Sequence, residues 1–366
     1  MNIVRTLSRW FVGLVFIFSG FVKGVDPLGT AFRIEDYLVA YTLEGFIPFS
    51  LCLSVLLCAF EFSLGVFLIL NIKPRYSYWA LLIIMSFFTI VTFYDAIYEP
   101  VPDCGCFGDV IILTNWQTFF KNIVLLLPTF VLFAHRNKAH SSWGNIHQWA
   151  VVSLVFAGFV WFSLFNYRNL PMIDFLAWKV GNIMVSENTE PLQFYLTYRN
   201  KQTGQMQEYL SPNFPFNDQE WLEQWEFVSQ RVVDPNPGPH HNLQIFDNEA
   251  NDMTEAFIDN PGHQFMLIVW KYEKVNRDAL KKMNEFFLRT ETDGHSFIAI
   301  APSADEGKLL AAELQLDYEF YFADHVELKI MVRSNPGLIL MKNGRVLAKW
   351  SQKNFPDYEE VKNILN

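Results

Sequence analysis

Long runs of apolar residues with at most one charged side chain each dominate the first half of the chain. Four of them are clear, at residues 10–22, 46–72, 78–94 and 116–134, and a fifth run covers residues 149–165. A hydrocarbon core about 30 Å thick requires about 20 apolar residues in a helix that rises about 1.5 Å per residue. Apolar residues extend the first run back toward Val4. The pattern therefore predicts five transmembrane helices in a lipid bilayer.

The middle of the chain contains shorter apolar segments. Residues 194–200 and 205–210 alternate on either side of a Thr203-Gly204 turn, which predicts a β-hairpin. Residues 211–240 are rich in Pro, Asn and Trp. We expect them to form an irregular connection that ends in a Pro-rich linker.

From residue 263 onward, predicted strands and helices alternate. Continuous apolar runs predict strands, and apolar positions spaced by three or four residues predict helices. The predicted strands are 265–270, 297–301, 320–322, 338–341 and 346–350, and the predicted helices are 276–289, 305–314 and 358–365. This order favours an α/β domain.

Composition separates the two halves as clearly as the pattern does. Residues 1–170 contain 10 basic and 9 acidic side chains, whereas residues 171–366 contain 18 and 29. The chain is 51% hydrophobic, which excludes a disordered protein. It has no basic stripe and no RNA-binding aromatic motif, so no nucleic-acid partner is expected. Its 4 cysteines show no zinc-like spacing and exclude a disulfide scaffold.

Basic residues near the helix ends indicate the orientation, because Lys and Arg concentrate in cytoplasmic loops. The N-terminus and the second and fourth loops carry Arg5, Arg9, Lys73, Arg75, Arg136 and Lys138. The first loop carries Lys23 and Arg33, and the third loop carries none. We therefore expect a protein of the bacterial inner membrane with a cytoplasmic N-terminus. Its third loop and residues 171–366 are then periplasmic.

Small and polar residues recur on one face of the second predicted helix and of the first. The stripes are Ser54, Cys58, Glu61 and Gly65, and Gly13, Gly20 and Gly24. Small residues allow helices to approach closely in lipid. Glu61 lies near the middle of its span, where an unpaired carboxylate is costly, so it is protonated or partnered. It is a candidate proton or hydrogen-bond donor to a carrier such as a quinone, or a residue that hydrogen-bonds two helices together.

The third loop contains two cysteines one residue apart, in the run Cys104-Gly105-Cys106-Phe107-Gly108-Asp109. A disulfide between them would close a small, strained ring, and strain makes a disulfide labile. The pair is a candidate redox dithiol. The alternatives are a structural thiol pair and soft ligands for a copper-like ion. Cys52 and Cys58 do not share a helix face, and we expect both to be buried membrane thiols.

Three features of residues 1–135 resemble the DoxX and MauE group of four-helix membrane proteins. They are Ser19-Gly20-Phe21-Val22-Lys23-Gly24-Val25-Asp26-Pro27 after the first helix, Glu61 in the second, and the Cys104 to Asp109 run before the fourth. MauE-like proteins are linked to methylamine utilisation and to the supply of disulfide-bonded periplasmic enzyme subunits. DoxX-like proteins are linked to quinone-dependent electron transfer. The resemblance thus implies a four-helix transmembrane domain with a redox role.

Residues 242–366 resemble the thioredoxin fold. Ser334-Asn335-Pro336-Gly337 stands at the place of that fold's cis-proline, and Lys342-Asn343-Gly344 stands at the turn of its last hairpin. The family's redox cysteines would follow the strand at 265–270, but residues 271–276 read Lys-Tyr-Glu-Lys-Val-Asn. The resemblance therefore implies a degenerate thioredoxin-like domain that lacks the CxxC pair and cannot exchange dithiols itself.

These features predict a four-helix membrane domain followed by three further parts. The four-helix domain covers residues 1–135. The further parts are a cytoplasmic loop with a fifth transmembrane helix at 136–170, a hairpin and linker region at 171–241, and the exported thioredoxin-like α/β domain at 242–366. The first hypothesis is a membrane oxidoreductase. Its Cys104 and Cys106 pass electrons between an exported thiol protein and a carrier, and Glu61 handles a proton. The alternative is a non-catalytic membrane assembly factor whose thioredoxin-like domain binds a client.

Overall fold

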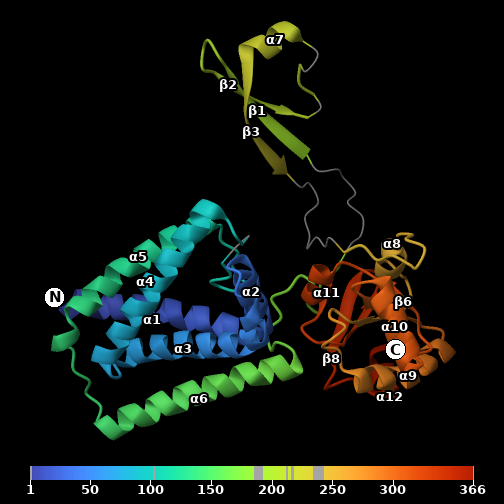
Figure 1. Cartoon of the computed structure of the whole chain (residues 1–366), viewed down its shortest axis with the longest axis horizontal. Helices are drawn as coiled ribbons and strands as arrows, with labels where there is room; N and C mark the ends of the chain where they lie inside the picture. Colours follow the sequence, from blue (N-terminus) through green and yellow to red (C-terminus); the bar gives the residue numbers. More distant parts are fainter. Residues whose placement is uncertain are drawn as a thin grey trace.

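The first half of the chain consists of long helices, as its apolar pattern predicts. The computed structural model describes residues 2–101, 104–184, 193–211, 213–215, 218–233 and 243–365. The long helices are α1 (Asn2–Val25), α3 (Ser50–Leu70), preceded by the 3-10 turn η1 (Glu44–Phe49), α4 (Pro74–Tyr98), α5 (Asn115–Ala134) and α6 (Asn145–Asn169). The five predicted helices are therefore confirmed, and all five are long and apolar enough to cross a membrane (Figure 1).

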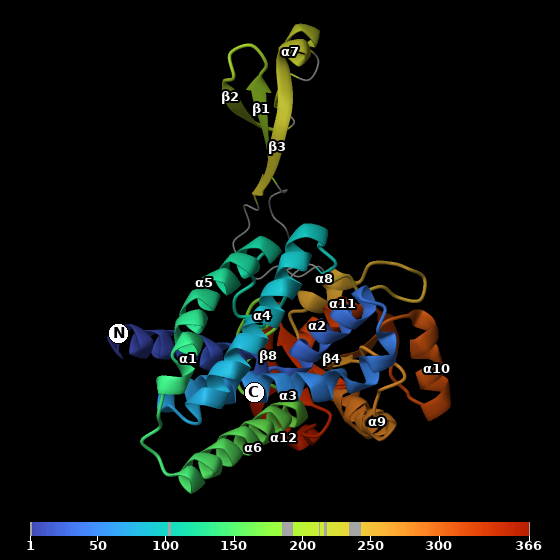
Figure 2. The same ribbon diagram turned by 60° about the vertical axis from the view of Figure 1, so that its left-hand side comes forward.

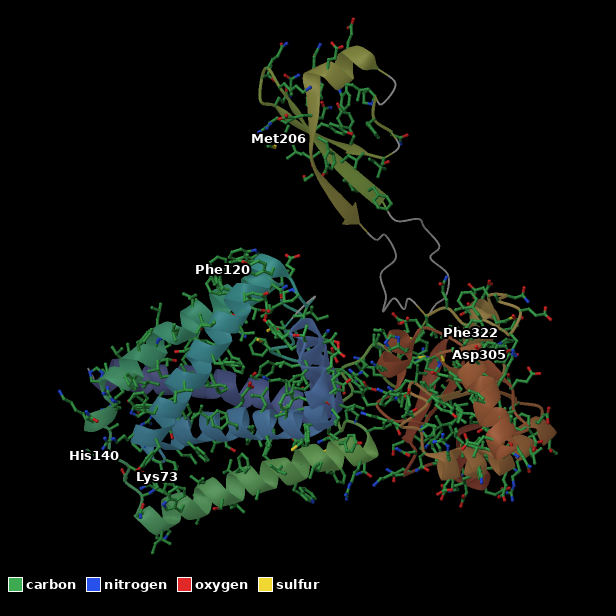
Figure 3. All side chains as sticks on the ribbon, in the orientation of Figure 1. Lys73, Phe120, His140, Met206, Asp305 and Phe322 are labelled. Carbon is green, nitrogen blue, oxygen red and sulfur yellow. The ribbon has the colours of Figure 1, made fainter. Side chains whose placement is uncertain are left out.

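The outward faces of these helices carry apolar side chains. Ile90, Leu127 and Leu154 are 70%, 64% and 74% exposed. Such faces suit lipid tails, because the hydrocarbon core offers no partner to a polar group. In Figure 3, Lys73 and His140 mark the end of the bundle farthest from the C-terminal unit. The chain's N-terminus lies at this same end (Figure 1).

Helices α1 and α3 approach each other closely at the predicted small-residue stripes. A Cβ atom on Gly20 would lie 2.5 Å from the backbone nitrogen of Phe62, and one on Gly65 would lie 2.7 Å from that of Ile17. Helix α6 packs against α3 through Phe159, whose ring stacks on Phe62 with centroids 4.2 Å apart. The glycines therefore set the distance between α1 and α3.

One helix of this half is absent from the sequence prediction. Helix α2 (Pro27–Ala40) starts after Asp26, whose carboxylate accepts a hydrogen bond from the Gly29 amide at 2.9 Å. Pro27 suits the first helical position because it has no amide hydrogen to lose. With 14 residues, α2 is too short to cross a bilayer. Figures 1 and 2 show it at the end of the bundle that faces the C-terminal unit.

Residues 193–233 form a small antiparallel sheet with strand order β2-β1-β3. Strands β1 (Gln193–Asn200) and β2 (Met206–Leu210) are the predicted hairpin. The expected irregular connection after it is wrong in part, because it contains α7 (Gln219–Gln224) and β3 (Trp225–Val233), which pairs with β1. Its tryptophans belong to an aromatic cluster: the ring of Trp221 lies 4.7 Å from that of Tyr198. The Pro-rich linker predicted at 234–239 lies outside the described residues.

The C-terminal unit contains a five-stranded mixed sheet with strand order β6-β5-β4-β7-β8. The strands are β4 (Gln264–Ile268), β5 (Ser296–Ala301), β6 (Phe320–Phe322), β7 (Gly337–Lys342) and β8 (Arg345–Ser351). Strand β4 is parallel to β5, antiparallel to β7 and buried along its whole length. A strand covered on both faces is apolar throughout, so its residues do not alternate. These strands confirm the predicted α/β domain.

Helices cover both faces of this sheet. The predicted helices, α9 (Arg277–Thr292), α10 (Ala304–Leu314) and α12 (Tyr358–Leu365), pack on one face. Two helices that the sequence analysis missed, α8 (Thr254–Ile258) and α11 (His325–Met331), cover the other face. With 5 and 7 residues, they are too short to show helical periodicity. The fully buried Trp178 and Met184 complete this second core. The Asn335–Pro336 peptide bond before β7 is cis, as expected.

The C-terminal unit rests against the end of the bundle that carries α2. The hydroxyl group of Ser351 donates a hydrogen bond to the carbonyl of Arg168 at 3.3 Å. The ring of Trp270, which follows β4, lies edge-on to Phe32 of α2 with centroids 5.5 Å apart. The loop between α4 and α5 meets the C-terminal unit at this end too, through Asp109. The cysteine loop and the C-terminal unit therefore lie on the same side of the bundle.

Candidate functional site

The two cysteines lie in a tight turn between α4 and α5. The amide of Gly108 donates a hydrogen bond to the carbonyl of Gly105 at 3.0 Å. Both glycines have positive φ angles, +61° at Gly105 and +55° at Gly108, in the region that residues with a Cβ atom avoid. The turn leaves Cys104 and Cys106 as partly exposed free thiols. The two glycines thus allow the chain to turn sharply between α4 and α5.

The two thiols differ in acidity. The Cys104 thiol hydrogen-bonds the Cys106 sulfur and so lowers the pKa of Cys106 to about 6; the ammonium groups of Lys121 and Lys23 act in the same direction, against burial. The same hydrogen bond, together with burial, raises the pKa of Cys104. Because the thiolate is the nucleophilic form, the lower pKa makes Cys106 the candidate nucleophile of the pair. Within the part of the chain that the structure describes, no group of three or more His, Cys, Asp or Glu side chains could hold a metal ion.

Glu61 has a charged partner inside the bundle. The Nζ atom of Lys23 lies 2.6 Å from Oε1 and 2.5 Å from Oε2 of Glu61, and both side chains are buried. The prediction that Lys23 is a loop charge is wrong, because α1 continues past the uncharged run to Val25. Lys23 therefore lies in the last turn of α1 and neutralises the carboxylate of Glu61.

Ser19 connects Glu61 to the cysteine loop. Its Oγ atom lies 2.9 Å from Oε2 of Glu61 and 2.8 Å from the carbonyl oxygen of Cys106. A hydroxyl group has one hydrogen to donate. Ser19 therefore donates to one of these two oxygens at a time, and its hydroxyl group lies between the carboxylate of Glu61 and the cysteine loop. Ser19 thus places the carboxylate of Glu61 beside the backbone of the cysteine loop.

A cavity of about 290 Å³ unites these groups. Most of its wall is apolar, and the apolar residues include Phe16, Leu57, Phe88, Val91 and Leu125. Its volume is close to the lower end of small-molecule pockets, which measure about 300–1,000 Å³. Cys104, Cys106 and Glu61 all line it, together with Ser19 and Lys23. The structure thus brings the three residues predicted from the sequence to one cavity.

A second buried carboxylate, which the sequence analysis missed, lies beside the cavity. Asp95 of α4 is fully buried and accepts hydrogen bonds from the hydroxyl groups of Tyr37 at 2.6 Å and Tyr41 at 3.4 Å. Both tyrosines line the cavity. Burial and the hydrogen bond to Asp95 raise the pKa of Tyr37, which keeps it a donor. The uncharged run ends one residue before Asp95, so this residue looked like the end of the span, although α4 continues to Tyr98.

Comparisons with known proteins single out the membrane half. No curated protein and no solved structure matches the chain. Residues 1–135 match the model of a family described as methylamine utilisation protein MauE. The matched segment contains α1 to α5 and every residue that lines the cavity. Residues 1–135 of this membrane protein therefore match the MauE family, which is linked to methylamine utilisation.

Proposed function

We propose that this chain is a membrane thiol oxidoreductase whose Cys104–Cys106 dithiol is oxidised by a quinone bound in the cavity. The observation that carries the proposal is that one mostly apolar cavity is lined both by the two thiols and by the Lys23–Glu61 ion pair. A quinone has an apolar ring and two carbonyl oxygens. It therefore suits a pocket with apolar walls and a few hydrogen-bond donors, which here include the ammonium groups of Lys23 and Lys121.

The proposed reaction balances in electrons and protons. The sulfurs of Cys104 and Cys106 lose two electrons and form a disulfide. The quinone supplies the two-electron acceptor and leaves as a hydroquinone after it gains two protons. The Cys104 thiol supplies one proton, and the Lys23–Glu61 pair supplies the other and regains it from solvent. Cys106, which carries the lower pKa, contributes its sulfur as the thiolate.

The second half-reaction returns the pair to the dithiol. A thiolate of an exported protein attacks the Cys104–Cys106 disulfide, and a second thiol of that protein resolves the mixed disulfide. The exported protein gains a disulfide, and Cys104 and Cys106 gain the two electrons and two protons. The partial exposure of both cysteines supports access by such a partner. The link of the MauE family to methylamine utilisation suggests a partner in that process.

The proposal also assigns the side of the membrane and the nature of the C-terminal unit. We place the cysteine loop in the periplasm of a bacterial inner membrane, because Lys73 and the chain's N-terminus lie at the opposite end of the bundle. We assign the C-terminal unit to the thioredoxin-like folds, since its sheet has strand order β6-β5-β4-β7-β8 and helices on both faces. Residues 271–276, which lead into α9, contain no cysteine.

The test uses the full-length protein in lipid nanodiscs, with Cys52 and Cys58 replaced by Ser. The reduced protein is mixed with a short-chain quinone, and hydroquinone is followed by absorbance while maleimide mass shifts count free thiols. We expect one hydroquinone for each disulfide formed. The same mass shift across a glutathione series gives the midpoint potential. Cys104→Ser and Cys106→Ser should abolish the reaction, and a pair that stays reduced in the presence of quinone would refute the proposal.

A cellular experiment separates this function from that of a non-catalytic assembly factor. Strains carry either Cys104→Ser with Cys106→Ser or a deletion of residues 242–366. If the protein is an oxidoreductase, the strain with the double cysteine variant should lose function to the same extent as a strain that lacks the protein. Intact function in that variant, together with loss of function in the deletion strain, would favour the assembly factor.

A further inference from the structure

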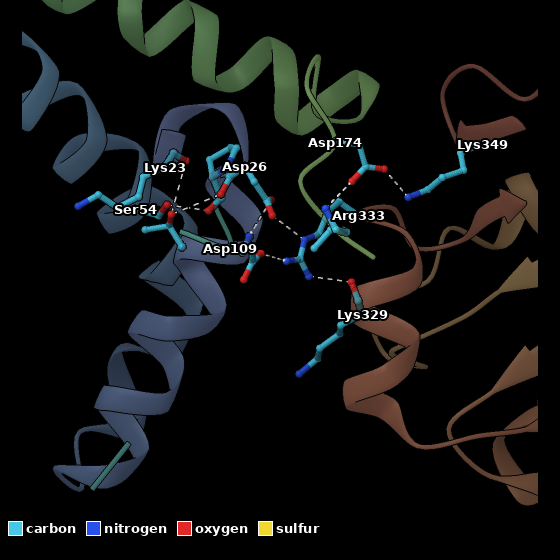
Figure 4. Close-up of polar contacts among 12 residues, drawn as sticks. Lys23, Asp26, Ser54, Asp109, Asp174, Lys329, Arg333 and Lys349 are labelled. Carbon is cyan, nitrogen blue, oxygen red and sulfur yellow. Dashed lines mark hydrogen bonds and ion pairs between the residues drawn. The ribbon is translucent and has the colours of Figure 1, made fainter. Parts of the chain in front are cut away.

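One guanidinium group connects the C-terminal unit to two places in the membrane half. Arg333 follows α11, and its side chain is buried. Its Nε atom donates a hydrogen bond to Oδ2 of Asp26 at 2.7 Å, and its Nη2 atom donates to Oδ2 of Asp109 at 2.9 Å. Its Nη1 atom donates to the carbonyl of Lys329 at 2.7 Å. Figure 4 shows this network between the three segments.

The two carboxylates stand at positions that matter for the candidate site. Asp109 belongs to the cysteine loop, three residues after Cys106, and Asp26 caps the first turn of α2. Arg333 therefore holds the cysteine loop against the start of α2, which supplies Tyr37 to the cavity. A planar guanidinium suits this role, because its donors are fixed in a fork that engages two carboxylates at once.

Helix α2 covers the part of the C-terminal unit around Arg333. Trp270, the last residue before the segment that would hold a redox pair, lies edge-on to Phe32 and donates its Nε1 hydrogen to the carbonyl of Ser334 at 2.9 Å. The ammonium group of Lys329 lies 4.8 Å from the centre of the Phe32 ring, and the guanidinium group of Arg333 lies 5.5 Å from the same centre. The end of β4 and the loop before β7 thus face the chain's own membrane half. A client would have to displace α2 to reach them.

We propose that the C-terminal unit is a clamp in cis and that Arg333 is a positioning residue for the Cys104–Cys106 pair. The inference rests on the proposed function and deepens it. Arg333 holds Asp109 and neutralises its charge, which fixes the loop in the arrangement that favours the Cys106 thiolate. The unit therefore supports the dithiol and does not carry electrons itself.

The clamp predicts how Cys106 changes when Arg333 is lost. In an Arg333→Gln variant the cysteine loop loses its anchor at Asp109, so the Cys104 thiol and the ammonium groups of Lys121 and Lys23 are no longer held in place around the Cys106 sulfur. We expect the pKa of Cys106 to rise by about one unit from its value of about 6. At pH 7 this shift makes the dithiol a weaker oxidant, by roughly fivefold in its exchange equilibrium with glutathione. Arg333→Lys keeps the charge but loses the fork, so we expect an intermediate shift.

The experiment measures the alkylation rate of the reduced full-length protein in nanodiscs as a function of pH, and the exchange equilibrium with glutathione. Arg333→Gln is compared with two controls. Lys349→Gln breaks the Lys349–Asp174 contact of 2.7 Å at the same junction without touching the loop, and Arg277→Gln breaks an exposed pair with Glu313 on the C-terminal unit. Only the Arg333 variants should shift the alkylation profile. An unchanged profile in Arg333→Gln, or an equal shift in Lys349→Gln, would overturn the inference.

A second variant cuts the same contact from the membrane side. In Asp109→Ala, Arg333 keeps Asp26 as its partner, so the junction stays closed while the loop is released. We expect slower quinone-dependent oxidation of the dithiol, and an oxidation rate equal to that of the wild type would contradict the clamp. The alkylation profile needs no quinone. A failed clamp is therefore distinguished from a failed oxidoreductase proposal, in which the wild-type pair itself does not react with quinone.

Discussion

Lys23 and Glu61 form a buried ion pair at 2.5 Å, although 38 residues separate them in the sequence. Each charge is stable in the bundle because the other is present. Removing one partner of a buried pair leaves an uncompensated charge and costs about 3–5 kcal/mol, whereas replacing both with apolar residues is often neutral. Substitutions of this pair can therefore distinguish its effect on the stability of the bundle from its proposed role as a proton donor.

Single and double substitutions of this pair should therefore differ. We expect Glu61→Gln and Lys23→Met each to lower the thermal unfolding temperature in nanodiscs, and the double variant Lys23→Leu with Glu61→Leu to recover most of the loss. All three should lose quinone-dependent oxidation of the cysteines. A double variant as unstable as the single ones, or one that keeps full activity, would contradict this account of the pair.

The acidity of Cys106 gives a prediction about pH. Because the alkylation rate follows the thiolate fraction, Cys106 of the reduced protein should react at half its maximal rate near pH 6, its pKa, and should reach a plateau above pH 7. Iodoacetamide labelling with peptide mass spectrometry measures the profile. Cys104 should react only at much higher pH, since its pKa is raised.

Two substitutions of Cys104 test the cause of that acidity. Cys104→Ala removes the hydrogen bond that stabilises the Cys106 thiolate, so the half-maximal pH should rise. Cys104→Ser keeps a hydroxyl donor and should stay closer to the wild type. Equal profiles in the two variants would mean that the ammonium groups of Lys121 and Lys23, and not the neighbouring thiol, set the pKa of Cys106.

Gly20 offers a matched test of helix packing. A methyl group there would lie 2.5 Å from the backbone nitrogen of Phe62, so Gly20→Ala should force α1 and α3 apart at a cost of about 1–3 kcal/mol. Gly158 of α6 has no atom within 4 Å of the same position, and Gly158→Ala should leave the unfolding temperature unchanged or raised. Equal effects of the two substitutions would show that the close contact at Gly20 is not maintained in lipid.

Asp95 gives a prediction about buried hydroxyl groups. Asp95→Asn keeps an acceptor for the hydroxyl of Tyr37, whereas Asp95→Leu leaves that donor buried without one. An unsatisfied buried donor costs about 1–3 kcal/mol. The Leu variant should therefore unfold at a lower temperature than the Asn variant. If Tyr37→Phe is added to the Leu variant, the difference should shrink, and a persistent difference would assign it to another contact of Asp95.

Individual residues show how far the sequence could predict the site. Cys104, Cys106 and Glu61 were identifiable because thiols one residue apart and a carboxylate within an apolar run are visible in the sequence itself. Lys23 was misplaced, because the charge that ends an uncharged run looks like a loop residue, and only the partner at Glu61 brings it into the bundle. Tyr37 depends on α2, which the sequence analysis missed although Asp26 and Pro27 are typical of a helix start. The sequence does not show which helix ends lie next to each other in the folded protein, and the positions of Lys23 and Tyr37 depend on that tertiary arrangement.

The contact between Arg333 and Asp26 spans 307 residues, and this separation determines when it can form during biosynthesis. A ribosome makes the cysteine loop more than two hundred residues before Arg333. Until the C-terminal unit has been synthesised and folded, Asp109 has no contact with the guanidinium group of Arg333. A product that stalls or is truncated before Arg333 thus contains both cysteines but not the residue that holds their loop. The cysteine loop can take its final arrangement only after Arg333 has been synthesised.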